Sequence, residues 1–438
     1  EGAQKFCKRA KPKNIIDISA ITSIYRPGPL GADVDKMYVE AKDNPRKVNY
    51  LNEVVKEVTK ETYGFLIFQE QIALLAHKLG KDISLDEGNL LRKLLTKKGT
   101  GKGAREKEKI REKFIEGCKE KKIDAATAGS LWQRFEYFSG YGFNKSHAVS
   151  YSILSFQCAW LLNYYPAEWM AAFLDKEPEG RKEVAINLAK KHGFNIDGVT
   201  VNHSTSQWEI SDDGTTLVQP FSSIKGLGDK AIEQLIDNRP FGKIEEVLFN
   251  DDIVYAKLNK KALDVLCRSG ALDSLIDDRF TGRKHFWMAV AGDRPKTLKK
   301  FEENLTLYSP EGDFSDEESI EYISSLTGIF PFDLAMTDGM MQELEDHCIP
   351  ALGSWDQDLG VAWFIPREVI HKKTKNGKSY FILKVIDSTS TTTSIRCWGI
   401  NPDKDKVHIN RPYMAKLDYN EQWGFSTRSL KYNFRLLG

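Results

Sequence analysis

The chain has 438 residues, of which 41% are hydrophobic and 29% charged, and its 63 lysines and arginines nearly balance 62 acidic residues. This is an ordinary globular composition, so a fully disordered chain is excluded, and the length suits roughly three domains. The longest apolar stretch, around 159–162, is far too short to cross a bilayer. The six cysteines form no CxxC pair, which argues against a zinc ribbon or disulfide framework and favours reduced thiols.

Charge is distributed unevenly along the chain. Residues 92–122 contain thirteen lysines and arginines against five glutamates, whereas residues 302–321 contain eight acidic residues and no base. A dense basic block attracts polyanions such as nucleic acids or nucleotide phosphates. Residues 105–122 alternate bases with glutamates and also suit a solvated helix, while residues 92–103 contain no acid and are interrupted by glycines.

The first part of the chain is predicted to be helical. Apolar residues at i, i+3, i+4 and i+7 indicate an amphipathic helix over 50–61, and a second helix over 69–79 is expected to end at Gly80. Ser84 and Glu87 form an S-x-x-E capping box for a third helix. On this third helix we expect three leucines to share the buried face: Leu91, Leu94 and Leu95.

Two further helices are expected before residue 165. Asp124 is a suitable N-cap for a helix over 125–138. The sequence 144–147 then opens a helix that runs to about Asn163 and is apolar nearly all round, which predicts that this helix is buried.

The pattern changes in the second half. Residues 291–325 are predicted to be a mobile linker with an acidic end, and from about residue 360 short β-branched or aromatic segments alternate with turn residues. The five predicted strands span residues 361–370, 380–386, 391–398, 412–417 and 421–426. Five short strands favour a small β-barrel such as an OB-fold, with an SH3-like barrel as the alternative. The fold class is therefore multidomain, mainly α, followed by a small β-barrel.

A glycine-rich turn indicates contact with DNA. The sequence Ile224–Gly228 (IKGLG), followed by a helix, is typical of a helix-hairpin-helix, in which glycines let the backbone approach a phosphate and the helix N–H groups point at it. Candidate residues are Lys225, Gly226, Gly228 and Lys230. An ordinary glycine turn before a helix is the alternative.

The predicted barrel also carries candidate nucleic-acid residues. Its first hairpin bears four lysines next to Tyr380 and Phe381, and basic loops with aromatic platforms suit single-stranded nucleic acid. The four are Lys372, Lys373, Lys375 and Lys378. The alternative for Phe381 is a place in the barrel core. Two D-x-D triplets, at 356–358 and 403–405, are expected to be solvated turns, so no metal site is predicted in this chain.

Several segments resemble the bacterial replicative DNA polymerases of family C, the alpha subunit of DNA polymerase III. The resemblance extends over nearly the whole chain, and YGFNKSH, at residues 141–147, is its most specific motif. This motif lies within the matching segment 139–152 (SGYGFNKSHAVSYS). The other matching segments are 25–30 (YRPGPL), 62–71 (TYGFLIFQEQ), 90–98 (LLRKLLTKK), 165–172 (YPAEWMAA), 201–204 (VNHS), 224–228 (IKGLG), 268–275 (RSGALDSL) and 374–383 (TKNGKSYFIL).

The resemblance implies a domain order. Residues 1–175 correspond to the polymerase fingers with their palm-side root, and residues 176–290 to a helix-hairpin-helix region that binds DNA. Residues 291–350 correspond to a linker that carries a clamp-binding peptide, and residues 351–438 to an OB-fold domain.

The resemblance also implies a nucleotide-binding surface. In the family, the segments matching 90–98 and 144–147 face the incoming dNTP, which the basic residues suit because they meet triphosphate charge. The implied residues are Arg92, Lys93, Lys97, Lys98, Asn144, Lys145, Ser146 and His147. The family has a second arginine where Lys93 stands, and lysine keeps the charge but loses the bidentate geometry.

The family's metal-binding aspartates lie on a palm upstream of the segment where this chain begins. We therefore expect part of a DNA-directed DNA polymerase, a nucleotidyltransferase that is inactive as this chain alone, with Mg²⁺ bound by the absent palm. The implied partners are the primer–template, single-stranded template, dNTP and the palm-containing part, in a bacterial or phage-infected cytoplasm and without a membrane. A non-enzymatic DNA-binding scaffold with helix-hairpin-helix and OB modules is the alternative, but it would not need the YGFNKSH and LLRK motifs.

A short peptide resembles the sequence by which this family grips the ring-shaped sliding clamp. In the segment 304–308, Leu305, Leu307 and Tyr308 match the family pattern, and Asn304 replaces its glutamine. The alternative is a helix that packs Leu305 and Tyr308 onto the body of the protein.

Overall fold

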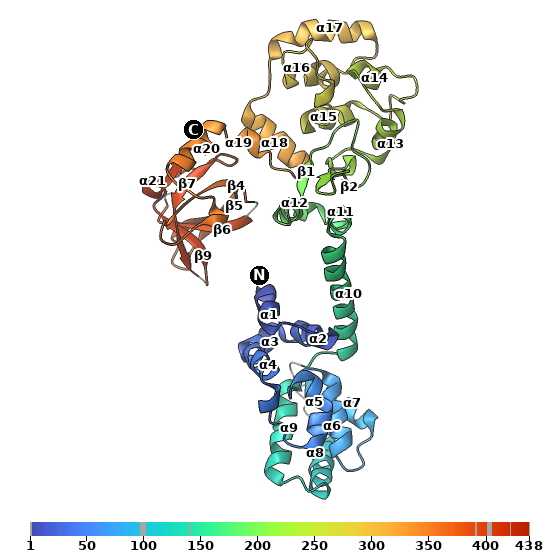
Figure 1. The fold of residues 1–438 in the computed structure, drawn as a ribbon, viewed down its shortest axis with the longest axis vertical. Helices are drawn as coiled ribbons and strands as arrows, with labels where there is room; N and C mark the ends of the chain where they lie inside the picture. The colour runs from blue at the N-terminus through green and yellow to red at the C-terminus, as the bar shows by residue number, and fades with distance from the viewer. Residues whose placement is uncertain are drawn as a thin grey trace. The chain divides into compact units, whose positions relative to one another are not determined.

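The computed structural model describes residues 2–96, 102–139, 142–389, 392–400, 405–420 and 422–437. The chain divides into two compact units, residues 1–164 and 165–438, and each is described by itself (Figure 1). Among the described helices, none is both long and apolar enough to cross a bilayer.

Helices build the described part of the first unit, and an isolated β-bridge joins Phe68 to Phe143. The helix predicted over 69–79 is confirmed at both ends, and the helix predicted over 50–61 is shorter and is followed by a 3-10 turn at Lys60–Thr62. The helices are α1 (Gly2–Ala10), α2 (Ile15–Ile24), α3 (Pro27–Gly31), α4 (Val34–Asp43), α5 (Glu53–Thr59), α6 (Gln69–Leu79), α7 (Leu85–Thr96), α8 (Lys102–Glu120), α9 (Ala125–Ser139) and α10 (Lys145–Tyr164).

The predicted helix caps are present. Ser84 Oγ accepts a hydrogen bond from the Glu87 N–H at 3.1 Å, and Glu87 Oε2 accepts one from the Ser84 N–H at 2.9 Å, which completes the capping box of α7. Lys113 and the Ser84 N–H hold the pKa of Glu87 below its usual value. Asp124 Oδ1 accepts from the Thr127 N–H at 2.8 Å and caps α9.

Two apolar clusters hold the first unit together. One joins α1, α2 and α4 through buried residues such as Phe6, Ile24 and Tyr38. The other joins α5 to α9, where the rings of Phe114 and Phe135 meet edge to face at 5.2 Å between centroids. The predicted leucine face of α7 is confirmed, since Leu91 is fully buried and Leu94 and Leu95 pack against the same cluster.

Helix α10 differs from its prediction. Its first turns do pack against α2, where Ala148 and Ser152 are buried and Ser19 Oγ donates a hydrogen bond to Ser152 Oγ at 3.1 Å. Every residue from 153 to 161, however, is exposed. The prediction of a buried helix is therefore wrong for this half, because the helix that α10 packs against covers only its first turns.

The second unit begins with a helical domain around a small sheet. The sheet has the order β1-β3-β2, with β1 and β3 parallel. Its apolar core draws on residues from 199 to 301, including the fully buried Phe221, Leu235 and Leu263. The elements are α11 (Pro166–Lys176), α12 (Lys182–Lys191), β1 (Asn195–Asp197), β2 (Glu209–Ile210), β3 (Thr216–Val218), α13 (Asp229–Asn238), α14 (Ile244–Leu248), α15 (Lys260–Ser269) and α16 (Arg283–Trp287).

Helices occupy the segment predicted to be a mobile linker. Within 291–325 lie α17 (Leu298–Tyr308) and most of α18 (Asp316–Thr327). Phe301 of α17 is buried in the core of the helical domain, and α18 packs against α15. The prediction of a mobile linker is therefore wrong. It followed from the high local charge, which does not show that Phe301 packs into the core. Two shorter helices follow, α19 (Phe332–Ala335) and α20 (Asp338–Asp346).

The chain ends in a sheet of seven strands with the order β10-β7-β4-β5-β6-β9-β8. All five predicted strands are present, and the structure adds the short β8 and β10. The elements are β4 (Val361–Lys373), β5 (Ser379–Ile386), β6 (Thr392–Trp398), β7 (Tyr413–Lys416), β8 (Asp418–Asn420), β9 (Gly424–Arg428), α21 (Leu430–Asn433) and β10 (Phe434–Leu436).

The order of pairing curls this sheet. Only Leu417 separates β7, which pairs with β4, from β8, which pairs with β9 at the other end of the sheet. One stretch of chain thus connects two distant strands, so the sheet wraps around a core that includes Phe364, Leu383 and Ile395. The predicted small β-barrel is confirmed as a curled half-barrel.

Candidate nucleotide and DNA interface

Two neighbouring side chains at the start of α6 connect the predicted nucleotide-binding segments. Glu70 Oε1 accepts a hydrogen bond from Asn144 Nδ2 at 3.0 Å, and Glu70 Oε2 accepts one from the Lys145 N–H at 2.9 Å. Gln69 Oε1 accepts from Arg92 Nη1 at 2.9 Å. The motifs at 62–71, 90–98 and 141–147 therefore meet in one place, although they lie far apart in the sequence.

Backbone contacts fix the same junction. The Gln69 N–H donates to the Phe143 carbonyl at 2.9 Å, and the Phe143 N–H donates to the Ile67 carbonyl at 3.0 Å. Gln69 Nε2 also donates to the Gly142 carbonyl at 2.9 Å. A β-bridge thus holds the loop before α10 against the loop before α6, which sets where α10 begins.

The start of α10 presents polar groups to solvent. Asn144 Oδ1 caps the helix by accepting from the His147 N–H at 2.8 Å, and it also accepts from Ser146 Oγ at 2.7 Å. Ser146 and His147 are exposed. The positive end of this 20-residue helix is already occupied by the Glu70 carboxylate, which accepts from the Lys145 N–H, and by the Asn144 cap, so the exposed side chains of Ser146 and His147 are the polar groups left at this end to meet a phosphate.

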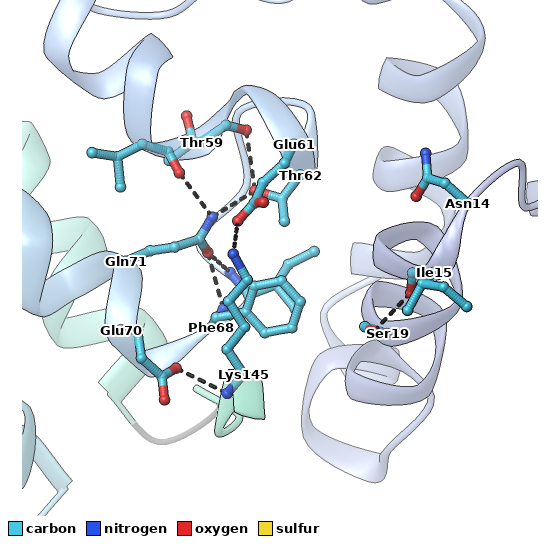
Figure 2. A network of polar contacts seen from close by, with 12 residues as sticks. Asn14, Ile15, Ser19, Thr59, Glu61, Thr62, Phe68, Glu70, Gln71 and Lys145 are labelled. Atoms are coloured by element: carbon cyan, nitrogen blue, oxygen red, sulfur yellow. Dashed lines mark hydrogen bonds and ion pairs between the residues drawn. The ribbon is translucent and has the colours of Figure 1, made fainter. Parts of the chain in front are cut away.

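Lys145 already has an acidic partner. Its Nζ forms an ion pair with Glu61 Oε1 at 2.5 Å while its N–H contacts Glu70, as Figure 2 shows. The Nζ also lies 5.6 Å from the centre of the Phe68 ring. Among the predicted nucleotide-binding residues, Lys145 is therefore bound within the fold, and its charge holds the loop at 61–68 against α10.

Buried polar contacts shape the loop before α6. Gln71 is 2% exposed, and its Oε1 accepts from the N–H groups of Ile67 and Phe68 at 2.9 and 3.0 Å. Its Nε2 donates to Thr62 Oγ1 at 2.8 Å (Figure 2). The loop that carries Phe68 and leads to Gln69 is thus fixed by a side chain that the sequence did not single out.

The structure describes one of the three remaining lysines of the predicted nucleotide site. Lys93 is exposed on α7, whereas Lys97 and Lys98 lie outside the described residues.

The sequence analysis did not identify Arg26 as a site residue. Its guanidinium lies 4.6 Å from the centre of the Phe143 ring, and burial lowers the pKa of Arg26. The sequence analysis also missed the roles of Glu61, Gln69 and Glu70. For Gln69 and Glu70 the available signal was their place in the matching segment 62–71.

The helix-hairpin-helix turn has the predicted backbone geometry. Gly226 has φ +90°, a conformation that favours glycine, and Gly228 precedes α13 with no side chain capping the helix. Open space surrounds the position that a Gly228 Cβ would occupy. Lys225 and Lys230 are exposed, and Lys261 Cε lies 3.7 Å from where a Gly226 Cβ would be. The exposed backbone of the turn at Gly226–Gly228 therefore lies close to lysine side chains.

The four predicted lysines of the curled sheet are all exposed on or near the hairpin between β4 and β5. Phe381 is 2% exposed and belongs to the core, so the core alternative holds for that residue. Tyr380, in contrast, stacks on Trp398 with 4.5 Å between ring centroids and 24° between planes, and it pairs with Lys372 across the strands. Trp398 is the aromatic partner that the sequence missed.

The peptide at 304–308 is part of α17. Asn304 is fully buried, and its Nδ2 donates to the carbonyls of Ala289 and Asp293 at 3.1 and 2.6 Å. Leu305 packs against the core, whereas Leu307 is 61% exposed. In this helix the three candidate clamp-binding residues, Leu305, Leu307 and Tyr308, are not presented together to a partner.

No group of three or more histidine, cysteine, aspartate or glutamate side chains in the described ranges is arranged to hold a metal ion. The exposed Asp356 and Asp358 of the first D-x-D triplet are joined through a turn, in which the Asp358 N–H donates to Asp356 Oδ1 at 2.7 Å. Part of the second triplet lies outside the described residues.

Two regions of the chain match known families. Residues 1–122 match the bacterial DNA polymerase III alpha subunit finger domain, and residues 193–281 match the helix-hairpin-helix motif. The second match includes the glycine turn at 224–228.

Curated relatives agree with these matches. The chain is 34% identical over 282 residues to DNA polymerase III subunit alpha of Xylella fastidiosa, a region that covers 64% of the chain and 23% of the relative. It is 32% identical over 332 residues to the same subunit of Borreliella burgdorferi, covering 74% of the chain and 28% of the relative. The chain therefore spans about a quarter of the length of the relatives it matches.

Proposed function

We propose that this chain, which contains the finger domain and helix-hairpin-helix region of a DNA polymerase III alpha subunit, holds the incoming dNTP and the primer–template for template-directed nucleotidyl transfer. One observation carries the proposal: the Gln69–Glu70 pair joins Arg92 to the start of α10. A fixed guanidinium complements the negative charge of a triphosphate, and the exposed side chains of Ser146 and His147 offer hydrogen-bonding groups beside it.

The residues divide into two roles. Arg92 and Lys93, with Lys97 and Lys98 further along the chain, contact the triphosphate, and Ser146 and His147 contact it from the start of α10. Gln69, Glu70 and Asn144 position these groups. Lys145 acts through its ion pair with Glu61, which holds the loop before α6.

DNA is held in the second unit. The backbone of Gly226–Gly228 contacts a phosphate, with Lys225 and Lys230 adding charge, and such contacts hold DNA without reading its sequence. The exposed lysines of the β4–β5 hairpin, together with the Tyr380–Trp398 stack, bind single-stranded template.

The catalytic metal lies elsewhere in the enzyme. The described residues form no metal site, and the family implies that Mg²⁺ would be held by aspartates of the palm. Bound there, Mg²⁺ would stabilise charge at the reacting phosphate, while Arg92, Ser146 and His147 bind and orient the dNTP.

Titration of the chain with dATP tests the nucleotide role. Arg92→Ala removes a charged hydrogen bond worth about 1.5–3 kcal/mol, so the dissociation constant for dATP should rise by roughly tenfold or more. Arg46→Ala is the control, because Arg46 is an exposed arginine that lies outside the basic block. Equal loss of affinity in both variants would mean that the loss of any positive charge weakens dATP binding, and this would overturn the assigned nucleotide site.

A further inference from the structure

A cavity in the first unit lies apart from the contacts between Gln69, Glu70 and the start of α10. Its volume is about 450 Å³, which is within the range of about 300–1,000 Å³ that is usual for small-molecule sites. The helices α4 and α9 and the segments 44–49 and 63–66 form its walls. All of these residues belong to the first unit.

The walls of this cavity are mainly apolar. Val34, Met37 and Ala41 line it from α4, where their spacing places them on one face of the helix. Tyr137 and Phe138 contribute aromatic rings from the end of α9. Such walls favour a ligand with an apolar body, because that body leaves water when it enters the cavity.

Tyr63 and Phe65 form an aromatic wall that buried neighbours hold in place. The buried Tyr38 ring meets Tyr63 edge to face at 5.5 Å between centroids and meets Phe65 at 6.3 Å. The Tyr63 hydroxyl donates to Asp17 Oδ1 at 3.2 Å, and the buried Asp17 also pairs with Lys42. Burial, together with the Asp17 carboxylate, raises the pKa of Tyr63 to about 12, so this ring is uncharged at neutral pH. The wall is therefore formed before a ligand arrives, which lowers the entropic cost of binding.

The cavity also contains a cation that lacks a partner. Arg134 is half-buried on α9 and forms no hydrogen bond or ion pair with any residue that the structure describes. A guanidinium that has lost part of its water is stabilised by an anion, which it can bind through two parallel N–H groups. Lys47 adds a second positive charge, and Glu40 is the one acidic residue among the described lining residues. The charge of the lining therefore favours a ligand with a single negative group.

We propose that this cavity binds a small aromatic anion, a planar apolar body that carries one carboxylate or sulfonate group. The body packs between α4 and the wall of Tyr63 and Phe65, and the anionic group binds Arg134. The residues assigned to the dNTP, such as Arg92 and His147, do not line this cavity. The inference therefore goes beyond the proposed function and does not depend on it.

Two probes that differ only in charge test the site. Naphthalene sulfonate is an aromatic body with a negative group, and naphthalene sulfonamide is a neutral molecule of the same shape. Isothermal titration calorimetry with the complete chain would measure the dissociation constants of both probes. The sulfonate should bind roughly tenfold more tightly than the sulfonamide, because Arg134 forms charge-assisted hydrogen bonds with the sulfonate.

Arg134→Gln should abolish this preference, so that the two probes bind about equally well. The variant should fold normally, because Arg134 has no partner among the described residues that would be left unpaired. Arg105→Gln removes the same charge from an exposed position on α8 and should leave the preference unchanged.

Ala41→Trp tests the apolar part of the cavity. The indole would fill space beside α4, so both probes should bind more weakly whatever their charge. Ala126→Trp adds the same side chain at an exposed alanine of α9 and should have no effect. Circular dichroism would verify that each variant keeps its helices.

Several results would overturn the proposal. The two probes could bind the unmodified chain equally well or not at all, or Arg105→Gln could reduce the preference as much as Arg134→Gln does. Displacement of the sulfonate by dATP would assign the cavity to the nucleotide, and displacement by oligothymidylate would assign it to the template.

The outcome is separable from the proposed function. If Arg92→Ala weakens dATP binding while Arg134→Gln leaves the probes unaffected, the nucleotide role stands and the anion site falls. If Arg134→Gln abolishes the preference but Arg92→Ala has no effect on dATP, the anion site stands and the nucleotide role falls.

Discussion

Arg92 Nη1 donates a hydrogen bond to Gln69 Oε1 at 2.9 Å, and the amide of Gln69 donates in turn to the Gly142 carbonyl at the same distance. A single uncharged side chain thus joins a cation of α7 to the loop that precedes α10. Because Gln69 uses both ends of its amide, its loss affects the cation and the loop together.

Gln69→Leu should therefore weaken dATP binding even though it removes no charge. The guanidinium of Arg92 would lose its acceptor, and the loop at Gly142 would lose a donor, so we expect about a tenfold loss of affinity, which corresponds to about 1.4 kcal/mol. Titration with dATP measures the effect. Gln207→Leu, at an exposed glutamine of the second unit, is the control; unchanged affinity in Gln69→Leu would show that Arg92 needs no positioning.

Glu70→Ala should destabilise the first unit. It removes the acceptor of both Asn144 Nδ2 and the Lys145 N–H, and lost hydrogen bonds to a charged group cost about 1.5–3 kcal/mol each. Urea denaturation followed by circular dichroism would measure the change in the free energy of unfolding. Glu53→Ala serves as the control, since Glu53 pairs with Lys56 at the exposed surface of α5; equal stability of the two variants would contradict the role of Glu70.

Gly228→Val should weaken binding to duplex DNA of any sequence. The backbone of Gly228 is extended, with φ −94° and ψ 152°, so valine fits the fold, but its side chain would keep a phosphate away from the start of α13. Fluorescence anisotropy at low salt measures the affinity. Gly198→Val adds the same side chain at another uncrowded glycine and should bind normally. If both variants bind DNA like the unmodified chain, the turn is only structural.

Trp398→Ala should weaken binding of oligothymidylate. Loss of the ring that stacks on Tyr380 removes part of an aromatic platform worth about 1–3 kcal/mol per base. Replacing Lys372 and Lys378 with alanine should instead reduce the dependence of affinity on salt, because these lysines neutralise phosphates. Tyr432→Ala, which removes an aromatic ring that is 78% exposed on α21, should have no effect. A salt-independent interaction would argue against the site.

Asn304→Ala should destabilise the second unit, whereas Leu307→Ala should not. Asn304 is buried and satisfies the carbonyls of Ala289 and Asp293, and leaving a buried group without its partner costs about 1–3 kcal/mol. Thermal unfolding would compare the two variants. If Asn304→Ala unfolds at the same temperature as the unmodified chain, Asn304 does not hold residues 304–308 in the fold. The prediction of a clamp-binding peptide at 304–308 would then stand.

The sequence by itself determined the features that depend on neighbouring residues. The capping box of Ser84 and Glu87, the Asp124 cap and the glycine turn at 224–228 were all predicted, because a cap or turn is decided within four or five residues. The strands from residue 361 onward followed from their β-branched and aromatic residues and the turns between them.

Only the tertiary structure decided which residues meet and which faces are covered. The role of Glu70 depends on residues more than seventy positions away, and local sequence carries no trace of that contact. Composition predicted that α10 is buried and that residues 291–325 are mobile, yet residues 153–161 are exposed while Asn304 is buried. Apolar character says that a side chain favours contact over water, whereas the partner for that contact is set by the packing of distant segments or by another molecule.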